Sequence, residues 1–271
     1  MKKSELTSEI YGGFERHLRE NERCRGTIEK YLRDVKRFLI WMPENVTKDT
    51  LVQWREYLKE NGYAPVTINS MLAAVNSFMS YLESQGMDTA GLRVKYLRIQ
   101  HRMFRNERQQ LSEAEYKNLV HTAEKLGKSW LALLMETICS TGIRVSEVQY
   151  ITVEAVKDRK AVISLKGKIR TILIPEKLAH KLLKYAKKQK IVSREIFLTR
   201  NGKGISRKQI WAEMKSLCDC AGIASSKVFP HNLRHLFATT FYRMYQDIVR
   251  LADVLGHSSM ETTRIYLLTP C

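Results

Sequence analysis

Apolar residues recur every three or four positions through residues 1–86, which is the spacing of helices that bury one face. Over 27–42 the apolar stripe consists of Ile28, Tyr31, Leu32, Val35, Phe38, Leu39 and Met42. A second helix is predicted over 48–60, and a third from Pro65 onwards, because proline suits a first helical turn. Together with an amphipathic segment over 5–22, these helices predict a four-helix N-terminal domain.

The helical pattern stops at residues 87–110. From residue 93 onwards the charged side chains of this stretch are cationic except for Glu107; they are Arg93, Lys95, Arg98, Arg102, Arg105 and Arg108. We interpret the stretch as a linker between domains. A linker this basic is expected to lie along a phosphate backbone, and the alternative is a solvated loop that happens to be basic.

Residues 111–271 predict a second domain that is mainly helical, with a small antiparallel β-sheet at one edge. Ser112 and Glu115 form the capping-box pattern of a helix start, and the apolar run Trp130–Cys139 predicts a buried helix. Two β-prone runs on either side of a glycine within 160–175 predict a hairpin. The remaining predicted helices cover 177–190, 206–221, 231–245, 248–256 and 260–268.

Length and composition fit two domains with separate cores. The chain has 271 residues, of which 44% are hydrophobic and 27% charged, as in ordinary globular proteins. Its net charge of +18 favours a polyanionic partner, nucleic acid before an anionic membrane surface. Residues 1–86 hold 13 Lys/Arg against 12 Asp/Glu, whereas residues 87–271 hold 33 against 16. The anion is therefore expected mainly at the later part of the chain.

The cysteines and the N-terminal residues point away from an exported or membrane protein. The five cysteines are scattered and odd in number, which favours reduced thiols in a cytoplasm over a disulfide framework. Cys218 and Cys220 lack the second close pair that a zinc site needs, so no metal is expected. The start of the chain lacks the apolar core of a signal peptide, and no apolar run approaches the ~18 residues of a membrane span.

Several side chains near the C-terminus suit a phosphodiester. Pro230 predicts a helix start, so His231 and Arg234 stand at positions i and i+3 on one face. Arg144 follows a helix-ending glycine and is expected to open the next helix, where its planar fork suits two phosphate oxygens. The alternative for Arg144 is an ion pair with Glu147 at i+3.

Four sequence boxes together resemble the tyrosine recombinase (phage integrase, Xer-like) family. The run DIVRLADVLGHSSMETTRIY resembles the family's C-terminal signature, in which a tyrosine follows the LGH histidine by nine residues. PHNLRH is similar to its HxxR box, TGIRVSE to its first-arginine box, and LKGKIRTILIP to the hairpin bearing its lysine. The boxes occur in the family's order, and the N-terminal helices resemble its core-DNA-binding domain less specifically.

The resemblance implies a site-specific DNA recombinase or integrase that cleaves and rejoins strands without metal or ATP. Tyr266 would attack the scissile phosphate and form a 3′-phosphotyrosyl link, and Lys166 would protonate the departing 5′-oxygen. Lys168 flanks the same glycine and competes with Lys166 for this role. The physical chemistry agrees, because a phenol with a pKa near 10 needs cations close by to ionise.

The resemblance also implies roles for the other polar residues of the boxes. Arg144 and Arg234 would bind the non-bridging phosphate oxygens in the transition state. His231 would help to deprotonate the tyrosine, and His257 would donate a hydrogen bond to a phosphate oxygen. Glu147 is interpreted as a buttress of the site, and His235 as structural.

Candidate DNA contacts lie in the predicted N-terminal domain and linker. In the first domain they are Lys30, Arg33, Arg37, Thr67, Asn69 and Ser70. In the linker they are Arg93, Lys95, Arg98, Arg102 and Arg105.

The resemblance further implies double-stranded DNA with a core site as the partner. A dimer on each site, a homotetramer on paired sites and an accessory DNA-bending protein are expected, in a bacterial or phage-encoded protein associated with the nucleoid. Five residues follow Tyr266, fewer than is usual in the family, so the expectation is a truncated chain or another mode of subunit contact. An arm-binding domain is not expected. Two alternatives stay open: a DNA-binding protein that has lost catalysis, and a monomeric type IB topoisomerase.

Overall fold

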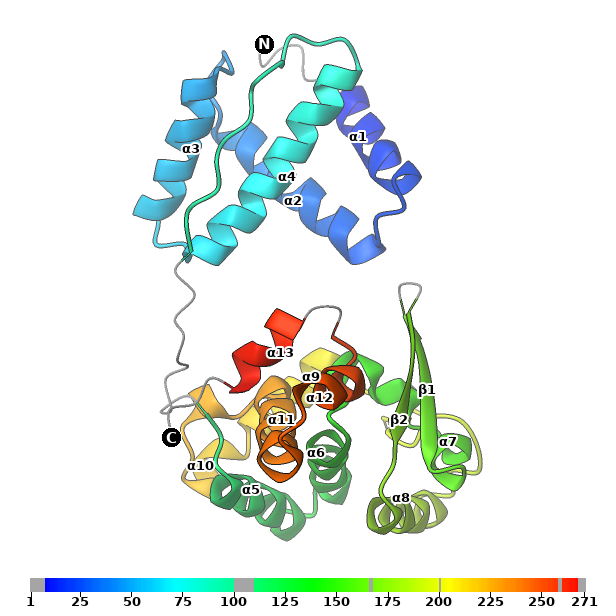
Figure 1. Cartoon of the computed structure of the whole chain (residues 1–271). Coiled ribbons are helices and arrows are strands. Elements are labelled where there is room, and N and C mark those ends of the chain that lie inside the picture. Colours follow the sequence, from blue (N-terminus) through cyan, green and yellow to red (C-terminus); the bar gives the residue numbers. More distant parts are fainter. Residues whose placement is uncertain (1–7, 100–109, 166–167, 200, 258–259, 268–271) are drawn as a thin grey trace. The chain divides into compact units, whose positions relative to one another are not determined.

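The chain divides into two compact units, Met1–His101 and Arg102–Cys271 (Figure 1). The structure is a computed structural model and describes residues 8–99, 110–165, 168–199, 201–257 and 260–267. Each unit has its own cluster of buried apolar side chains. In the part of the chain so described, no helix combines the length and the apolar character that crossing a membrane requires.

The first unit is the predicted four-helix domain. Its helices are α1 Ser8–Glu20, α2 Arg25–Trp41, α3 Lys48–Glu60 and α4 Pro65–Ser84. The side chains of Phe14, Phe38, Trp54 and Phe78 are completely buried, one from each helix. Edge-on contacts join Phe14 to Phe78 and Phe38 to Trp54, with ring centroids 5.1 and 5.7 Å apart. These contacts join α1 to α4 and α2 to α3, and all four rings belong to one buried cluster.

The first half of the predicted linker belongs to the first unit. After α4 the chain turns at residues 88–91 and then continues without regular secondary structure over 92–99, and Val94 is buried in the core of this unit. The Asn76 amide exchanges two 3.0 Å hydrogen bonds with the Val94 backbone, and Asn69 pairs with the Leu97 backbone in the same way. Paired asparagine amides satisfy backbone groups of this segment, so it packs on the first unit without an apolar period.

The second unit is mainly helical with a small hairpin, as the sequence predicted. Its helices are α5 Glu113–Lys125, α6 Ser129–Thr141, α7 Val153–Lys157, α8 Glu176–Lys188, α9 Arg207–Lys215, α10 Cys218–Ala221, α11 Pro230–Tyr245, α12 Ile248–Leu255 and α13 Met260–Leu267. Short 3₁₀ helices are η3 Val145–Tyr150 and η4 Ser225–Lys227. Strands β1 Lys160–Leu165 and β2 Lys168–Leu173 pair antiparallel, with Leu165 opposite Lys168.

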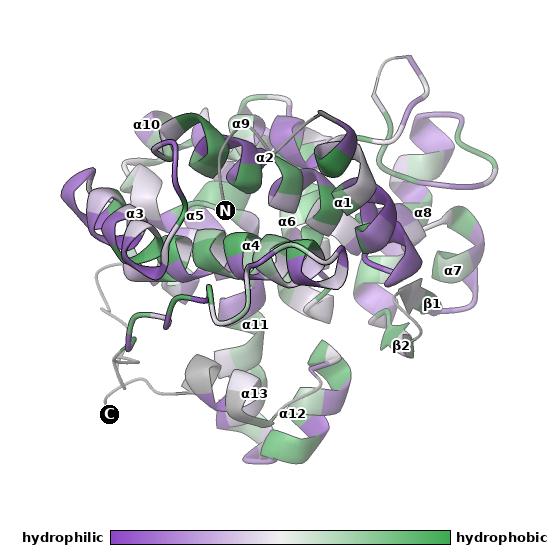
Figure 2. Cartoon of the chain, turned by 90° about the horizontal axis from the view of Figure 1, so that it is seen from above, coloured by the Kyte–Doolittle hydropathy of each residue, from purple (hydrophilic) through white to green (hydrophobic). Residues whose placement is uncertain are grey.

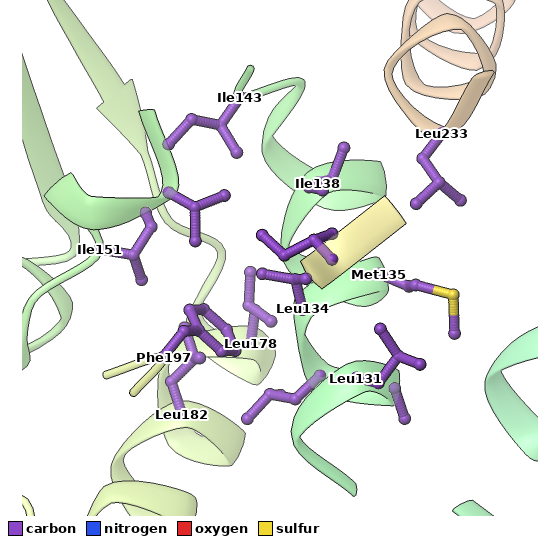
Figure 3. Close-up of a cluster of buried hydrophobic side chains, with 14 of the residues drawn as sticks. Leu131, Leu134, Met135, Ile138, Ile143, Ile151, Leu178, Leu182, Phe197 and Leu233 are labelled. Carbon is purple, nitrogen blue, oxygen red and sulfur yellow. The ribbon is translucent and has the colours of Figure 1, made fainter. Parts of the chain in front are cut away.

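Helix α6 is the centre of the second core (Figure 3). Leu131, Leu134 and Ile138 are fully buried, and Figure 3 shows them among side chains from neighbouring elements, including Leu182 of α8 and Leu233 of α11. In Figure 2 most helices of both units carry hydrophobic stretches interrupted by hydrophilic ones, as amphipathic helices do. Helix α6 is more uniformly apolar because neighbours cover it on several sides.

Glycine at position 142 turns the chain from α6 toward the site. Gly142 caps α6 in the left-handed conformation, with φ of 63°, and its N–H donates to the Ile138 carbonyl at 2.9 Å. A Cβ here would lie 2.5 Å from the Phe237 ring of α11. The residue therefore allows both the turn and the close approach of α11.

Candidate active site

A cleft of about 1390 Å³ opens in the second unit. Residues of η3, of β2 and of the end of α12 line part of it: Arg144, Glu147, Arg170, Gly256 and His257. Apolar side chains of α11, among them Phe237 and Phe241, line another part. A cationic surface beside an apolar wall can bind an anion in partial isolation from water, which strengthens electrostatic attraction.

Three carbonyl oxygens at the C-terminal end of α12 organise this cleft. Those of Val254, Leu255 and Gly256 each accept a hydrogen bond from a different arginine. The donors are Arg170 at 2.9 Å, Arg234 at 2.7 Å and Arg144 at 3.2 Å. The last carbonyls of a helix lack intrahelical partners and carry its partial negative charge. This helix end therefore gathers three guanidiniums from three distant parts of the chain.

Arg144 stands at the mouth of the cluster. It opens the next helix, η3, as expected, and Glu147 closes this 3₁₀ turn: the carboxylate accepts from the Arg144 backbone at 2.9 Å and from its guanidinium at 3.0 Å. The Arg144 side chain stays 39% exposed and lines the cleft. The ion pair expected as the alternative is therefore present, and phosphate binding by Arg144 stays a prediction. The ion pair positions an arginine that can still meet a ligand.

Arg234 is almost fully buried, at 3% exposure, and links two helix ends. It donates to the carbonyl oxygens of Gly142, which caps α6, and of Leu255 in α12. Its Nη2 also lies 3.1 Å from Nε2 of His257. A buried guanidinium needs such acceptors to offset its desolvation.

Glu147 is the buried anion of the cluster, with 2% of its side chain exposed. Its carboxylate pairs with Arg144 and with Arg170 of β2. Burial raises its pKa, but the hydrogen bond from the Arg144 backbone and the charges of both arginines outweigh burial and hold the pKa below its usual range. Glu147 is therefore ionised and buttresses the site, as its position in TGIRVSE suggested.

His257 is neutral at physiological pH in this geometry. Desolvation, followed by the charges of Arg234, Arg144, Arg170 and His231, lowers its pKa to about 4. Because an arginine only donates, Nε2 accepts from Arg234 and the proton sits on Nδ1, which donates to Thr263 Oγ1 at 2.9 Å. Both ring nitrogens thus have protein partners, and this geometry does not display the phosphate donor that the resemblance implied.

Helix α13 of this same unit contains Tyr266, the expected nucleophile. It packs against α11 and α12 of its own chain (Figure 1), and Thr263 on it is completely buried. Tyr266 follows Thr263 by three positions in α13. The Tyr266 side chain lies outside the described part of the structure. The bond from His257 to Thr263 connects the arginine cluster to the helix that carries this tyrosine.

His231 and the lysines complete the predicted set. His231 is the second residue of α11, is exposed, and is near enough to His257 to lower that pKa. Lys166 lies outside the described residues, in the connection between β1 and β2, and Lys168 is the first residue of β2. Lys168 pairs with Leu165 at the last position of the hairpin ladder, and the choice between Lys166 and Lys168 stays a prediction.

Two residues of the cluster were missed by sequence reasoning. Arg170 stands in phase with the buried Ile172 and Ile174, while Ile169, Thr171 and Leu173 are exposed. An arginine among the apolar positions of an alternating strand could have indicated a buried, functional side chain. Thr263 carried no comparable signal, because a threonine in a short helix is ordinary.

The predicted DNA contacts of the first unit have varied surroundings. Lys30 and Arg33 both pair with the buried Asp34, at 2.6 and 3.4 Å, and Arg37 donates to the Tyr63 hydroxyl at 3.0 Å. Asn69 uses its amide on the Leu97 backbone, and its side chain therefore has a structural role, as does the Ser70 carbonyl that accepts from Lys30. DNA contact by Asn69 and Ser70 stays a prediction.

The remaining candidates are exposed or lie outside the described residues. Those exposed to solvent are Thr67, Arg93, Lys95 and Arg98. Arg93 also pairs with Glu83 at 3.1 Å. Arg102 and Arg105 fall outside the described residues.

Comparisons with known proteins agree with the two-unit division. The phage integrase family matches residues 109–269, and the phage integrase N-terminal SAM-like domain matches residues 12–86. Tyrosine recombinase XerA of Pyrococcus furiosus is 28% identical over 98% of this chain and 91% of its own length. Tyrosine recombinase XerD of Vibrio cholerae is 27% identical over 93% and 87%, respectively.

Solved structures show the same fold. XerH recombinase bound to its difH substrate superposes with a TM-score of 0.71 at 18% identity, covering 94% of this chain and 81% of XerH. A lambda integrase dimer bound to a COC′ core site gives a TM-score of 0.76 at 16% identity, covering 96% and 95%. These likenesses concern the fold, whereas the matched family covers more than half of the chain.

Proposed function

The chain belongs to the phage integrase family of tyrosine recombinases, and we propose that it cuts and rejoins duplex DNA through a 3′-phosphotyrosyl intermediate. The observation that carries this proposal is the arginine cluster on the last carbonyls of α12. The cluster holds three guanidiniums against one carboxylate, so it has a net positive charge and fits one phosphate.

The chemistry assigns one role to each group. The Tyr266 phenolate oxygen bonds to phosphorus while the bond from phosphorus to the 5′-oxygen breaks. The phenol proton passes to His231, and Lys166 supplies the proton that the 5′-oxygen takes up. Arg144 and Arg234 hold the non-bridging oxygens, whose negative charge grows in the transition state. Because these cations are fixed beforehand, we propose that cleavage needs no metal ion.

The phosphotyrosyl ester conserves the energy of the broken phosphodiester. A 5′-hydroxyl of another strand can therefore attack it and restore a DNA backbone without ATP. This reversibility distinguishes strand exchange from nuclease action. The complete set of polar groups argues against a DNA-binding protein without catalysis. Relaxation of supercoiled DNA by a single copy would instead indicate the type IB topoisomerase alternative.

The assembly that we propose is a dimer on each core site and a tetramer on paired sites. XerH and lambda integrase are recombinases of the same fold that were solved on DNA sites, the latter as a dimer. In the first unit we propose Lys30, Arg33, Arg37 and Thr67 as phosphate or groove contacts. An accessory DNA-bending protein would lower the cost of aligning the two sites.

A substrate with a designed nick tests the proposal. Duplexes are first selected from a randomised pool for binding to the full-length protein, and the cleavage position is mapped. A nick just 3′ of that position lets the fragment with the 5′-hydroxyl diffuse away, so the covalent adduct accumulates. We expect the adduct to form in EDTA and to be lost in Tyr266→Phe. An adduct that survives this substitution overturns the nucleophile, and a strict Mg²⁺ requirement overturns the metal-free mechanism.

A further inference from the structure

We propose that Arg170 is a positioning residue of the active site, which holds Glu147 and the end of α12 in place for Arg144 to bind phosphate. The inference rests on the proposed function for its kinetic consequences. Arg170 belongs to β2 and lies within the LKGKIRTILIP box. It is not one of the residues to which the resemblance gave a role. It contacts the site's components without being one of the groups assigned to the reaction.

The contacts of Arg170 join three elements. From β2 its Nη1 donates to the Val254 carbonyl of α12 at 2.9 Å, and its Nη2 pairs with the Glu147 carboxylate of η3. The side chain is 12% exposed, and its Nε is buried without a hydrogen-bond partner among the described residues. A planar fork can serve an anion and a carbonyl at once, which a lysine ammonium does with much less directional control.

The backbone of α12 leaves room for this arrangement. Gly256 is left-handed, with φ of 61°, and a Cβ on it would lie 2.5 Å from Cδ of Arg170. The glycine that ends the helix therefore also lets the Arg170 stem pass beside the His257 turn. The arginine and the glycine fit as a pair.

Electrostatics explains why Arg170 matters for Arg144. Glu147 has two carboxylate oxygens, and Arg170 and Arg144 each pair with one side of this anion. If Arg170 loses its charge, the buried carboxylate keeps Arg144 as its main cationic partner. Arg144 is then drawn toward Glu147 and away from an incoming phosphate, because a buried charge holds its remaining partner strongly. Arg170 thus frees Arg144 for the ligand.

Salt dependence separates positioning from direct phosphate binding. We expect Arg170→Met to slow single-turnover cleavage of the nicked substrate by about 10- to 100-fold, because small displacements of a reacting geometry have effects of this size. In an Arg144→Met background, where the phosphate contact that Arg170 supports is already absent, adding Arg170→Met should not change the slope of log DNA affinity against log salt concentration. A slope lowered by about one unit means that Arg170 contacts a phosphate itself, which overturns the positioning role.

Removing the anion provides a second readout. The buried Glu147 charge is the proposed cause of the slower cleavage in Arg170→Met. The double variant Arg170→Met with Glu147→Gln should therefore cleave faster than the product of the two single-variant rate reductions predicts. Multiplicative effects refute the coupling. Arg170→Lys should restore only part of the rate. Arg159→Met is the matched control, since Arg159 precedes the same hairpin, is 60% exposed and pairs with Glu176 at 3.6 Å.

A functional failure can be told apart from a failure of this inference. If wild-type protein forms no adduct, the proposed function fails and the kinetic comparison cannot begin. The Arg170–Glu147 coupling is then still measured by the same double-variant cycle on thermal unfolding of the full chain. If the changes in unfolding free energy of the two single variants add up to that of the double variant, Arg170 and Glu147 do not stabilise each other. This result would refute the coupling whatever reaction the site performs.

Discussion

The charge state of His257 gives the sharpest test of the site's electrostatics. Desolvation and three arginines lower its pKa to about 4, against 6.5 for the unperturbed side chain. A folded pKa below the unfolded one means that the unfolded chain takes up the proton first. His257 therefore costs no stability above pH 6.5, and the protein loses stability as pH falls from 6.5 toward 4.

The size of this effect follows from the two pKa values. Between pH 7.5 and pH 5 the unfolded side chain becomes almost fully protonated, whereas the folded one stays mostly neutral. Linkage then gives a loss of about 2 kcal/mol, which is an upper bound because the ring is not fully buried. His257→Gln keeps a polar side chain at this position but removes the titration, so it should lack this part of the loss.

Nuclear magnetic resonance of the full chain measures the pKa directly. The Cε1–H signal of His257, assigned by its loss in His257→Gln, should stay constant from pH 8 down to about pH 5. Urea unfolding at pH 7.5 and pH 5, read by hydrogen exchange of α6 and α11 peptides, should show wild type losing more stability than His257→Gln. The control variant is His121→Gln, because His121 is an exposed histidine of α5. A midpoint near 6.5 for His257, or equal pH losses in wild type and His257→Gln, refutes the reasoning.

Three further variants test other parts of the site. Lys166→Ala should slow adduct formation by about 10²- to 10⁴-fold. A sulfur in place of the 5′-bridging oxygen of the substrate should restore the rate, because a thiolate leaves without a proton. If Lys168→Ala behaves this way instead, the general acid is Lys168. Thr263→Val should slow cleavage without weakening DNA binding in a filter assay, because it removes the hydrogen bond to His257. Thr263→Ser should cleave at a rate close to wild type. Equal cleavage rates for the two variants would show that this hydrogen bond has no part in the mechanism. Gly256→Ala should destabilise the protein by about 1–3 kcal/mol in thermal unfolding, because φ is 61° and the Cβ meets Arg170. An unchanged melting temperature would show that the turn can relax.

Local sequence features predicted most helices correctly. Ser112 with Glu115 predicted the capping box that opens α5, and Pro65 and Pro230 each begin a helix in the structure. These features act within one or two turns of backbone, so neighbouring residues suffice to specify them. The alternation around residue 167 likewise predicted the β1–β2 hairpin.

Features that depend on distant partners were not predictable from local pattern. The segment 87–99 looked like a free linker because its backbone partners, Asn69 and Asn76, lie on α4. Arg144 opens the next helix as expected, but the 3₁₀ form of that helix depends on the carboxylate of Glu147, which folds back on the Arg144 backbone. In both cases a side chain satisfied backbone groups that regular structure would otherwise pair.

The sequence by itself determined which groups this protein can bring to a phosphodiester: a phenol, lysines, histidines and arginines in the order of a known family. Only the tertiary structure decided that arginines from distant parts of the chain meet at the end of α12. Three arginines separated by up to 90 positions donate to three successive carbonyls there, and Glu147 joins two of them. The physical reason is that a helix end offers unpaired carbonyls and partial negative charge, whose partners depend on how distant segments pack.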